Sequence, residues 1–152
     1  MSYILNLKKE KFKFSAAHFA LFGPYCAERM HGHNYYLRVT LWASDVSEDL
    51  GLAVEFNSIK PRIEQECLKL NEYVLIPNRS PYLKVVMVND QIEVRFNQKF
   101  YSLPKEDVLL LPVRNISVEE LSHYIAQRLK ADFSKLPNLN AYAVELEETR
   151  GQ

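Results

Sequence analysis

The sequence predicts an α+β domain in which two helices pack on one face of an antiparallel sheet. Three observations support this fold class: segments of alternating polarity near both ends of the chain, two segments with apolar residues at helical spacing, and three short alternating segments between those helices. The chain has 152 residues, so we expect a single domain, residues 1–152.

Two strands are predicted in the first third of the chain. Hydrophobic and polar residues alternate from Lys11 to His18 and again from His31 to Trp42, with a loop containing glycine and proline between them. Such alternation is typical of strands with one buried face. The residues on the apolar face are Phe12, Phe14, Ala16 and His18 in the first strand and His31, His33, Tyr35, Leu37, Val39 and Leu41 in the second.

Two helices are predicted from apolar residues spaced three or four apart. Asn57 can cap the first helix, whose first turn is expected to contain Pro61, and a capping box that begins at Ser117 precedes the second. We expect Cys67 in the core and His123, which lies off the apolar stripe, on the solvated surface. The stripes are Ile59, Ile63, Cys67 and Leu70 in the first helix and Val118, Leu121, Ile125 and Leu129 in the second.

Residues 82–103 predict a three-stranded β meander, with tight turns at residues 89–90 and 97–98. A last strand is predicted in AYAVELEE, and the residues that share one of its faces are Val144, Leu146 and Glu148. The edges of such an open sheet must be covered, and pairing with other subunits is one way to cover them.

The charge and cysteine content argue against several functional classes. Basic and acidic residues balance at 19 each, which leaves no basic surface for nucleic acid. The apolar stretches are far shorter than the roughly 20 residues that span a bilayer, and the first 14 residues alternate rather than forming a signal-peptide core. Cys26 and Cys67 stand in dissimilar contexts and form no disulfide framework. We expect a cytoplasmic protein with reduced thiols that binds neither nucleic acid nor membrane.

Three histidines on one predicted surface indicate a metal site. His31 and His33 are two residues apart on a strand and therefore project from the same face, with Gly32 between them. His18 ends the preceding strand on its apolar face, about 5 Å from cross-strand neighbours at Cβ. Three imidazoles without a fourth protein ligand leave one tetrahedral position open, which is typical of catalytic zinc. A lone histidine would instead be read as an ordinary core or surface residue.

The loop before the histidine pair contains two candidate catalytic residues. A thiolate at Cys26, near zinc and a cation such as Arg29, would have a lowered pKa and could act as a base or nucleophile. Glu28 is the second candidate base. The alternative for both is a loop residue that faces solvent.

The segments SAAH, CAERMHGHNY and VELEET resemble the 6-pyruvoyl-tetrahydropterin synthase family, which includes bacterial 6-carboxytetrahydropterin synthases. The resemblance covers nearly the whole chain apart from the meander at about 82–103, which looks like an insertion. It implies the tunnelling fold, in which subunits trimerise into a barrel and commonly form hexamers. We therefore expect a homo-oligomer, a trimer or a hexamer.

The resemblance also implies roles for individual residues. The three histidines match the family's zinc ligands, and Cys26 falls near its catalytic cysteine. Glu148 matches the glutamate that anchors the pterin ring, and a carboxylate suits this role because it can accept two N–H bonds. Glu119 falls where the family has a glutamate that lines the pterin pocket. The alternative for Glu119 is a favourable charge in the first turn of a helix.

Two departures from the family pattern bear on the reaction. The usual Leu-Asp-His, whose Asp-His pair relays protons with the cysteine, is replaced by Leu70-Asn71-Glu72. Asn71 cannot act as a base, and Glu72 could do so only with a raised pKa. The loop also carries both Cys26 and Glu28. In one branch of the family, a glutamate three residues before HGH looks responsible for producing 6-hydroxymethyl-7,8-dihydropterin, a folate precursor.

Two classes of function follow from these features. The first is a zinc-dependent lyase acting on the side chain of 7,8-dihydroneopterin triphosphate, with a pyruvoyl, carboxy or hydroxymethyl pterin as product. The second is a pterin- or purine-binding protein that keeps the metal and Glu148 but is weakly active or inactive because Asn71 and Glu72 replace the relay.

Overall fold

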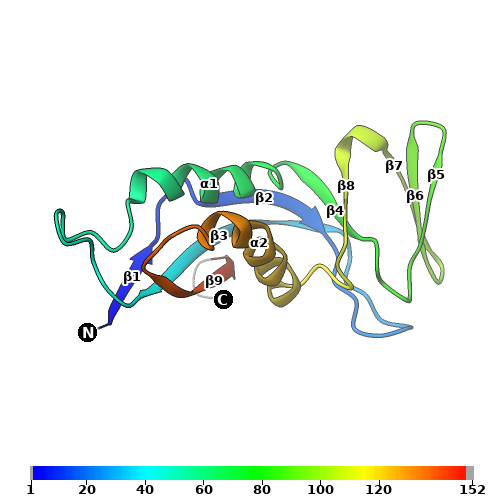
Figure 1. The fold of residues 1–152 in the computed structure, drawn as a ribbon. Helices are drawn as coiled ribbons and strands as arrows, with labels where there is room; N and C mark the ends of the chain where they lie inside the picture. The colour runs from blue at the N-terminus through cyan, green and yellow to red at the C-terminus, as the bar shows by residue number, and fades with distance from the viewer. Residues whose placement is uncertain (1, 150–152) are drawn as a thin grey trace.

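The computed structural model describes residues 2–149 as a main sheet, two α-helices and a separate small sheet (Figure 1). The small sheet stands at one end of the molecule, beyond the helices. The helices described between residues 2 and 149 include none long and apolar enough to cross a membrane. In chain order the elements are β1 (Tyr3–Leu7), β2 (Lys13–His18), β3 (His31–Ala43), α1 (Phe56–Leu68), β4 (Tyr73–Pro77), β5 (Lys84–Val88), β6 (Gln91–Phe96), β7 (Lys99–Pro104), the 3-10 helix η1 (Lys105–Asp107), β8 (Val108–Leu111), α2 (Val118–Phe133) and β9 (Leu139–Glu148).

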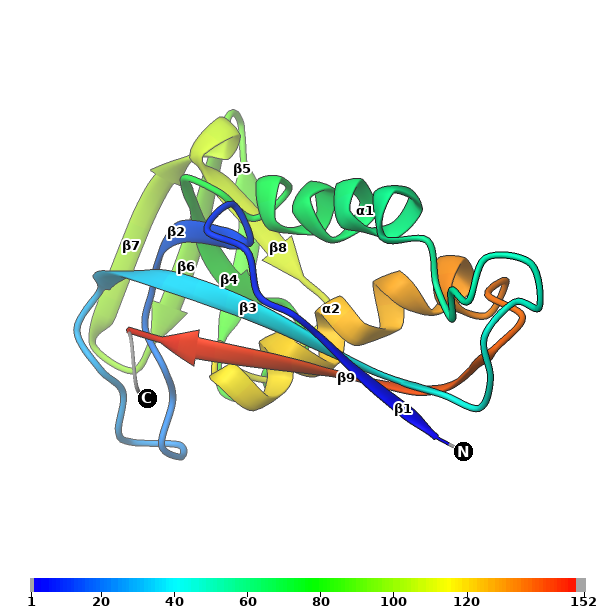
Figure 2. The same ribbon diagram turned by 90° about the vertical axis from the view of Figure 1, so that its left-hand side faces the viewer.

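Strand β3 is the long central strand of the main sheet. One of its edges pairs with β9, and the other pairs with β2 near the start of β3 and with β1 near its end, all antiparallel. Figure 2 shows β9, β3 and β1 running side by side in front of the helices. The predicted antiparallel pairing of the first two alternating segments is thus present, with His18 opposite His31.

The expectation of a wholly antiparallel sheet was wrong, because β4 pairs parallel with both β2 and β8. These two additional strands have the sequences YVLIP and VLLL, which are continuous apolar runs rather than alternating ones. Strands buried in parallel pairs have this composition, and short runs of this kind give no periodic signal. The sheet is therefore mixed, in the order β1-β3-β2-β4-β8 with β9 on the free edge of β3.

Both helices pack on one face of the main sheet, as predicted. Every residue of the two predicted stripes is buried except Val118, which packs partly buried against the same core. The core joins the stripes to sheet residues that include Phe14, Tyr35 and Leu37. This arrangement orients the odd-numbered side chains of β3, His31 and His33 among them, toward the helix side of the sheet.

The helix starts differ from the prediction in detail. Helix α1 begins at Phe56, Glu55 is its N-cap residue without a side-chain cap, and Pro61 lies beyond the first turn. For α2, the Ser117 hydroxyl accepts the Glu120 N–H as expected, but the Glu120 carboxylate binds Arg114 instead of completing a capping box. The charged guanidinium is a stronger partner for a carboxylate than a neutral backbone N–H.

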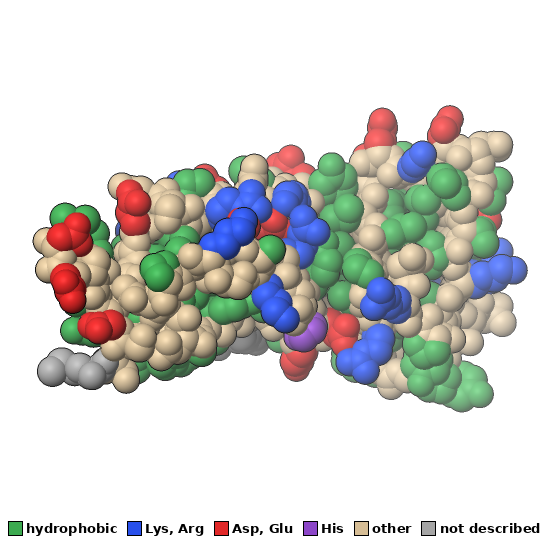
Figure 3. Space-filling view, viewed as in Figure 1, with side chains coloured by type: hydrophobic (Ala, Val, Ile, Leu, Met, Phe, Trp, Pro, Cys, Tyr) green, Lys and Arg blue, Asp and Glu red, His purple; other side chains and the backbone are tan. Residues whose placement is uncertain are grey.

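Strands β5, β6 and β7 form the predicted meander as a separate antiparallel sheet. Its two turns contain Asn89 and Asn97 in the left-handed region, at φ 54° and 51°, a conformation that asparagine tolerates well. Figure 3 shows hydrophobic side chains on the outer surface of this end of the molecule, with some lysine and arginine side chains among them, and a cluster of lysine and arginine side chains over the helices.

A buried ion-pair network joins the two helices. Glu66 of α1 is only 2% exposed, and its carboxylate accepts hydrogen bonds from Arg128 of α2 at 2.5 Å and from Lys69 at 2.6 Å. A buried carboxylate without partners is costly, so this network makes the packing of α1 on α2 depend on charge pairing as well as on apolar contact.

We predict that Arg128→Met lowers the free energy of unfolding by about 3 kcal/mol, the low end for breaking a buried ion pair, because Lys69 remains as a partner of Glu66. Urea denaturation would measure this loss. Arg62→Met is the matched control, since its partner Asp132 is 28% exposed and the loss there should stay below about 1 kcal/mol. Equal losses in the two variants would contradict the burial argument.

Candidate metal centre and active site

The register of β2 and β3 brings three histidine rings together at one end of the main sheet. His18 is directly opposite His31, and His33 is two residues further along the same face. The ring centroids are 4.8 Å apart for His18 and His31, 5.4 Å for His18 and His33, and 4.6 Å for His31 and His33. One nitrogen of each ring lies within 4.8 Å of the others, which is the spacing of three ligands around one ion.

The tautomer of His31 is set by the backbone. Its Nδ1 lies 2.7 Å from the carbonyl oxygen of Arg29, which can only accept, so Nδ1 carries the proton. Nε2 of His31 is then unprotonated, and it can accept the hydrogen bond from Nε2 of His33 at 2.8 Å or bind a metal ion. The bond from Nδ1 to the Arg29 carbonyl is the kind of outer hydrogen bond that orients metal-binding histidines in proteins.

His18 is the buried member of the group. It is 2% exposed, and neither ring nitrogen makes a hydrogen bond among the described residues, because Glu148 Oε1, 3.0 Å from Nε2, lies outside hydrogen-bond geometry. Burial lowers the pKa of His18, against the opposing effect of the Glu148 carboxylate, so the neutral ring that a metal requires is favoured. Buried polar atoms normally have a partner, and a metal ion at the centre of the three rings would provide one. The three histidines therefore fit a metal ion.

Glu148 reaches the histidines from the end of β9. Its Oε1 lies 3.0 Å from His18 Nε2 and 3.6 Å from His33 Nε2, and it accepts a hydrogen bond of 2.9 Å from the Tyr35 hydroxyl. Burial, followed by the charge and hydrogen bond of Glu148, raises the pKa of Tyr35 well above its usual value, so this phenol stays a donor. Tyr35 was expected on this face from its parity, but without a role.

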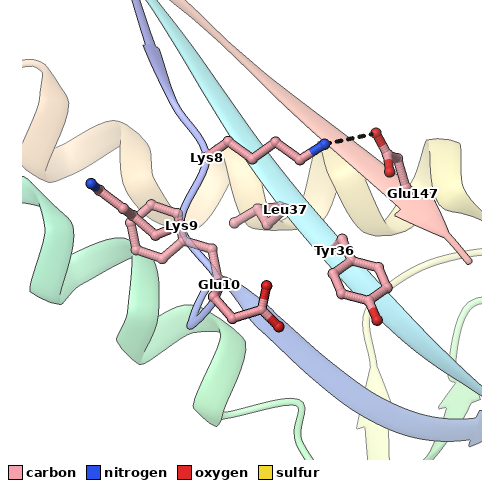
Figure 4. Close-up of a pocket in the computed structure, with 7 residues that line it drawn as sticks. Lys8, Lys9, Glu10, Tyr36, Leu37 and Glu147 are labelled. Carbon is pink, nitrogen blue, oxygen red and sulfur yellow. Dashed lines mark ion pairs between the residues drawn. The ribbon is translucent and has the colours of Figure 1, made fainter. Parts of the chain in front are cut away.

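The neighbouring Glu147 points to the opposite face of the sheet. Its carboxylate lies 3.6 Å from the ammonium of Lys8, beside a cavity of about 430 Å³ that Tyr36 also lines (Figure 4). Strand alternation thus separates two adjacent glutamates, and only Glu148 reaches the histidine cluster.

The β2–β3 loop (residues 19–30) brings Glu28 to the cluster. The Glu28 carboxylate accepts the Ala20 N–H at 2.9 Å, and its Oε2 is 3.9 Å from His31 Nε2. Cys26 is exposed, and none of the described contacts joins its thiol to a histidine. The two loop candidates are therefore placed differently, with Glu28 beside the rings.

Asn115 anchors this loop from the approach to α2. Its side-chain oxygen accepts the Leu21 N–H and its amide donates to the Leu21 carbonyl, both at 2.9 Å. A second anchor is Lys99 of β7, whose ammonium donates to the carbonyl oxygen of Glu28 at 2.6 Å. Both residues are distant in sequence from the loop, and no local pattern could have indicated them.

Glu119 lies exposed in the first turn of α2 and contacts none of the three histidines. Hydrogen bonds from backbone N–H and from the Ser117 hydroxyl lower its pKa. His123 is also exposed, as predicted.

The residues in place of the Asp-His pair lie beside β2. The Asn71 side-chain oxygen accepts the Ser15 N–H at 2.9 Å, and Glu72, in the left-handed region at φ 66°, donates its own N–H to the Ser15 carbonyl. Glu72 lines a cavity of about 460 Å³ with Ser15, Gly32 and Asn34. The Asn71 side-chain amide thus has a structural role, because it holds the backbone of Ser15.

The family model of 6-pyruvoyl tetrahydropterin synthase matches residues 6–152, a span that includes the meander. A Methanocaldococcus jannaschii protein, provisionally named a 6-carboxy-5,6,7,8-tetrahydropterin synthase, is 29% identical over 142 residues, which are 92% of this chain and 86% of that protein.

Solved structures of 6-pyruvoyl tetrahydropterin synthases have the same fold as this chain. The 6-pyruvoyl tetrahydropterin synthase of Plasmodium vivax superposes with a TM-score of 0.92 at 28% identity, covering 100% of this chain and 94% of that one. The Plasmodium falciparum enzyme gives 0.91 at 26% identity, covering 99% and 94%. A family match over almost the entire length, on a fold shared with these enzymes, shows that the chain belongs to the 6-pyruvoyl tetrahydropterin synthase family.

Proposed function

We propose that this protein is a zinc-dependent lyase that acts on the side chain of 7,8-dihydroneopterin triphosphate. The main observation in its support is that a carboxylate lies beside the three clustered imidazoles: Glu28 Oε2 is 3.9 Å from His31 Nε2. His18, His31 and His33 would hold the ion, which supplies polarisation of the substrate's side-chain hydroxyl groups. The all-nitrogen, three-ligand set favours zinc over iron or copper.

Glu28 is the proposed base. It takes the proton from the 2′-hydroxyl of the side chain, the bond between C1′ and C2′ breaks, and C1′ takes up a proton. The products are 6-hydroxymethyl-7,8-dihydropterin and the two-carbon aldehyde that carries the triphosphate. Solved variants of the Plasmodium vivax relative, in which a glutamate described as a catalytic residue is replaced by alanine or cysteine, support a catalytic glutamate in this chain.

Glu148 is proposed to bind the pterin ring. A carboxylate can accept two N–H bonds from the aminopyrimidine edge, and the Tyr35 hydroxyl holds one of its oxygens in place. This position beside the ion would fix the ring at a set distance from Glu28. Glu119 would contribute from a neighbouring subunit, because it lies away from the histidines of its own.

The proposed assembly is a cytoplasmic homo-oligomer, a trimer or hexamer closed into a barrel. The oligomer is inferred from the open strand edges of the main sheet: within residues 2–149, β9 and β1 each pair with β3 alone and β8 pairs with β4 alone. Unpaired edges of this length are usually covered.

A binding protein without turnover is the second candidate. It is favoured by Asn71, whose amide holds the backbone of Ser15 and offers no base to replace the family's relay. Such a protein would bind dihydroneopterin triphosphate and leave it unchanged.

We predict about one zinc ion per subunit in the purified protein, and loss of most of it in His31→Ala and His33→Ala, because two imidazoles hold an ion much less well than three. Metal analysis by inductively coupled plasma mass spectrometry measures this. His123→Ala, an exposed histidine on α2, is the control and should keep the full content. Full zinc content in both active-site variants would remove the metal assignment.

Glu28→Gln is expected to lower the rate of hydroxymethylpterin formation by about 10²–10⁴-fold, the usual contribution of a general base, since the amide keeps the shape but cannot accept the proton. Product analysis by mass spectrometry with zinc content measured in parallel checks this. Cys26→Ala should leave this product unchanged and suppress only a pyruvoyl or carboxy product. A wild-type rate in Glu28→Gln would show that the base is another residue.

Glu148→Ala should weaken dihydroneopterin binding by at least about 100-fold, because the two lost hydrogen bonds to a charged group contribute about 1.5–3 kcal/mol each. Zinc content should persist, since the three imidazoles remain. Isothermal titration calorimetry measures the affinity, with Glu147→Ala, on the opposite face, as the matched control. Equal affinities in the two variants would place the pterin site elsewhere.

A further inference from the structure

The small sheet packs directly on the β2–β3 loop through a second hydrophobic core. Phe19 and Leu21 of the loop are buried against Ile92, Val94 and Phe96 of β6. The rings of Phe19 and Tyr101 stack with centroids 5.3 Å apart. This core is separate from the one between the helices and the main sheet, so the small sheet and the loop form a packed unit of their own.

Two side chains at the β6–β7 turn hold the backbone of the loop. The Lys99 ammonium donates to the carbonyl oxygens of Ala27, at 3.3 Å, and Glu28, at 2.6 Å. The Asn97 side-chain amide donates to the carbonyl oxygen of Pro24 at 2.9 Å. All three acceptors are main-chain carbonyls of the β2–β3 loop, and the charged donor makes the stronger bonds.

These bonds complete the restraint of Glu28. Its N–H donates to the Ala20 carbonyl at 3.0 Å, its carboxylate accepts the Ala20 N–H at 2.9 Å, and its carbonyl accepts from Lys99. The residue is thus held at its backbone nitrogen, its backbone oxygen and its side chain. Of these three restraints, only the bond from Lys99 comes from outside the loop.

We propose that Lys99 is a positioning residue that sets the Glu28 carboxylate toward the histidine cluster, with Asn97 holding the other end of the same loop segment. The inference rests on the proposed role of Glu28 as the base. It gives the small sheet a function in the reaction: the sheet holds the loop that carries the base. Displacing a catalytic base by about 1 Å can lower the reaction rate on the order of 100-fold, so a bond that fixes the position of Glu28 affects the rate.

Steady-state kinetics on four proteins test this role. Lys99→Met should lower kcat by about 10-fold or more while KM changes by less than about 2-fold, because the pterin contacts and the zinc ligands are untouched. Lys99→Arg, which keeps a charged donor, should recover most of kcat. Lys84→Met removes the same charge from an exposed site on the same sheet and should match the wild type. Wild-type kcat in Lys99→Met would overturn the inference.

Amide hydrogen exchange gives a second readout that does not need turnover. The N–H groups of Phe22 and Glu28, which bond to the carbonyls of Cys26 and Ala20, should exchange faster in Lys99→Met than in the wild type or in Lys84→Met. Amides of β3 should be unchanged. A wild type that forms no product would defeat the proposed function, whereas unchanged exchange in Lys99→Met would defeat this inference whether or not the enzyme is active.

Discussion

The pairing of β2 with β3 is the constraint on which the candidate site depends. Because His18 and His31 are opposite each other in this register, the three imidazoles converge without any contribution from a distant segment. A slip of one residue would turn His18 to the other face of the sheet and place Phe14 in water. The buried side chains of Phe14 and Tyr35, stacked at 4.8 Å, resist such a slip, so the same packing stabilises the fold and aligns the ligands.

Charge balance links the histidines to their neighbours. Two carboxylates, Glu28 and Glu148, lie beside imidazoles that are neutral when they bind metal, and the buried His18 ring has unsatisfied nitrogens. A divalent cation would bind one of these nitrogens and offset both negative charges at once. The Tyr35 hydroxyl and the Ala20 N–H fix the two carboxylates in place. These carboxylates therefore need to move less when the substrate binds and reacts.

Periodicity was enough to predict the face of each alternating strand, both helical stripes and the histidine cluster, because these features depend on residues close in sequence or on adjacent strands. It could not reveal β4 and β8, whose short apolar runs have no period. It also missed the anchoring of the loop by Asn115 and Lys99, whose bonds span more than 70 residues. Long-range contacts of this kind follow from tertiary packing and leave no signal in a single sequence.

The proposed reaction requires the metal, the base and the substrate together, so a single incubation tests all three most directly. Zinc-loaded protein would be mixed with 7,8-dihydroneopterin triphosphate and every pterin product identified by mass spectrometry. We expect 6-hydroxymethyl-7,8-dihydropterin as the main product, together with the triphosphate-bearing two-carbon aldehyde. Unchanged substrate, bound but not converted, would contradict the proposed catalysis and favour the binding protein, and a pyruvoyl or carboxy pterin as the main product would contradict the assignment of Glu28 as the base.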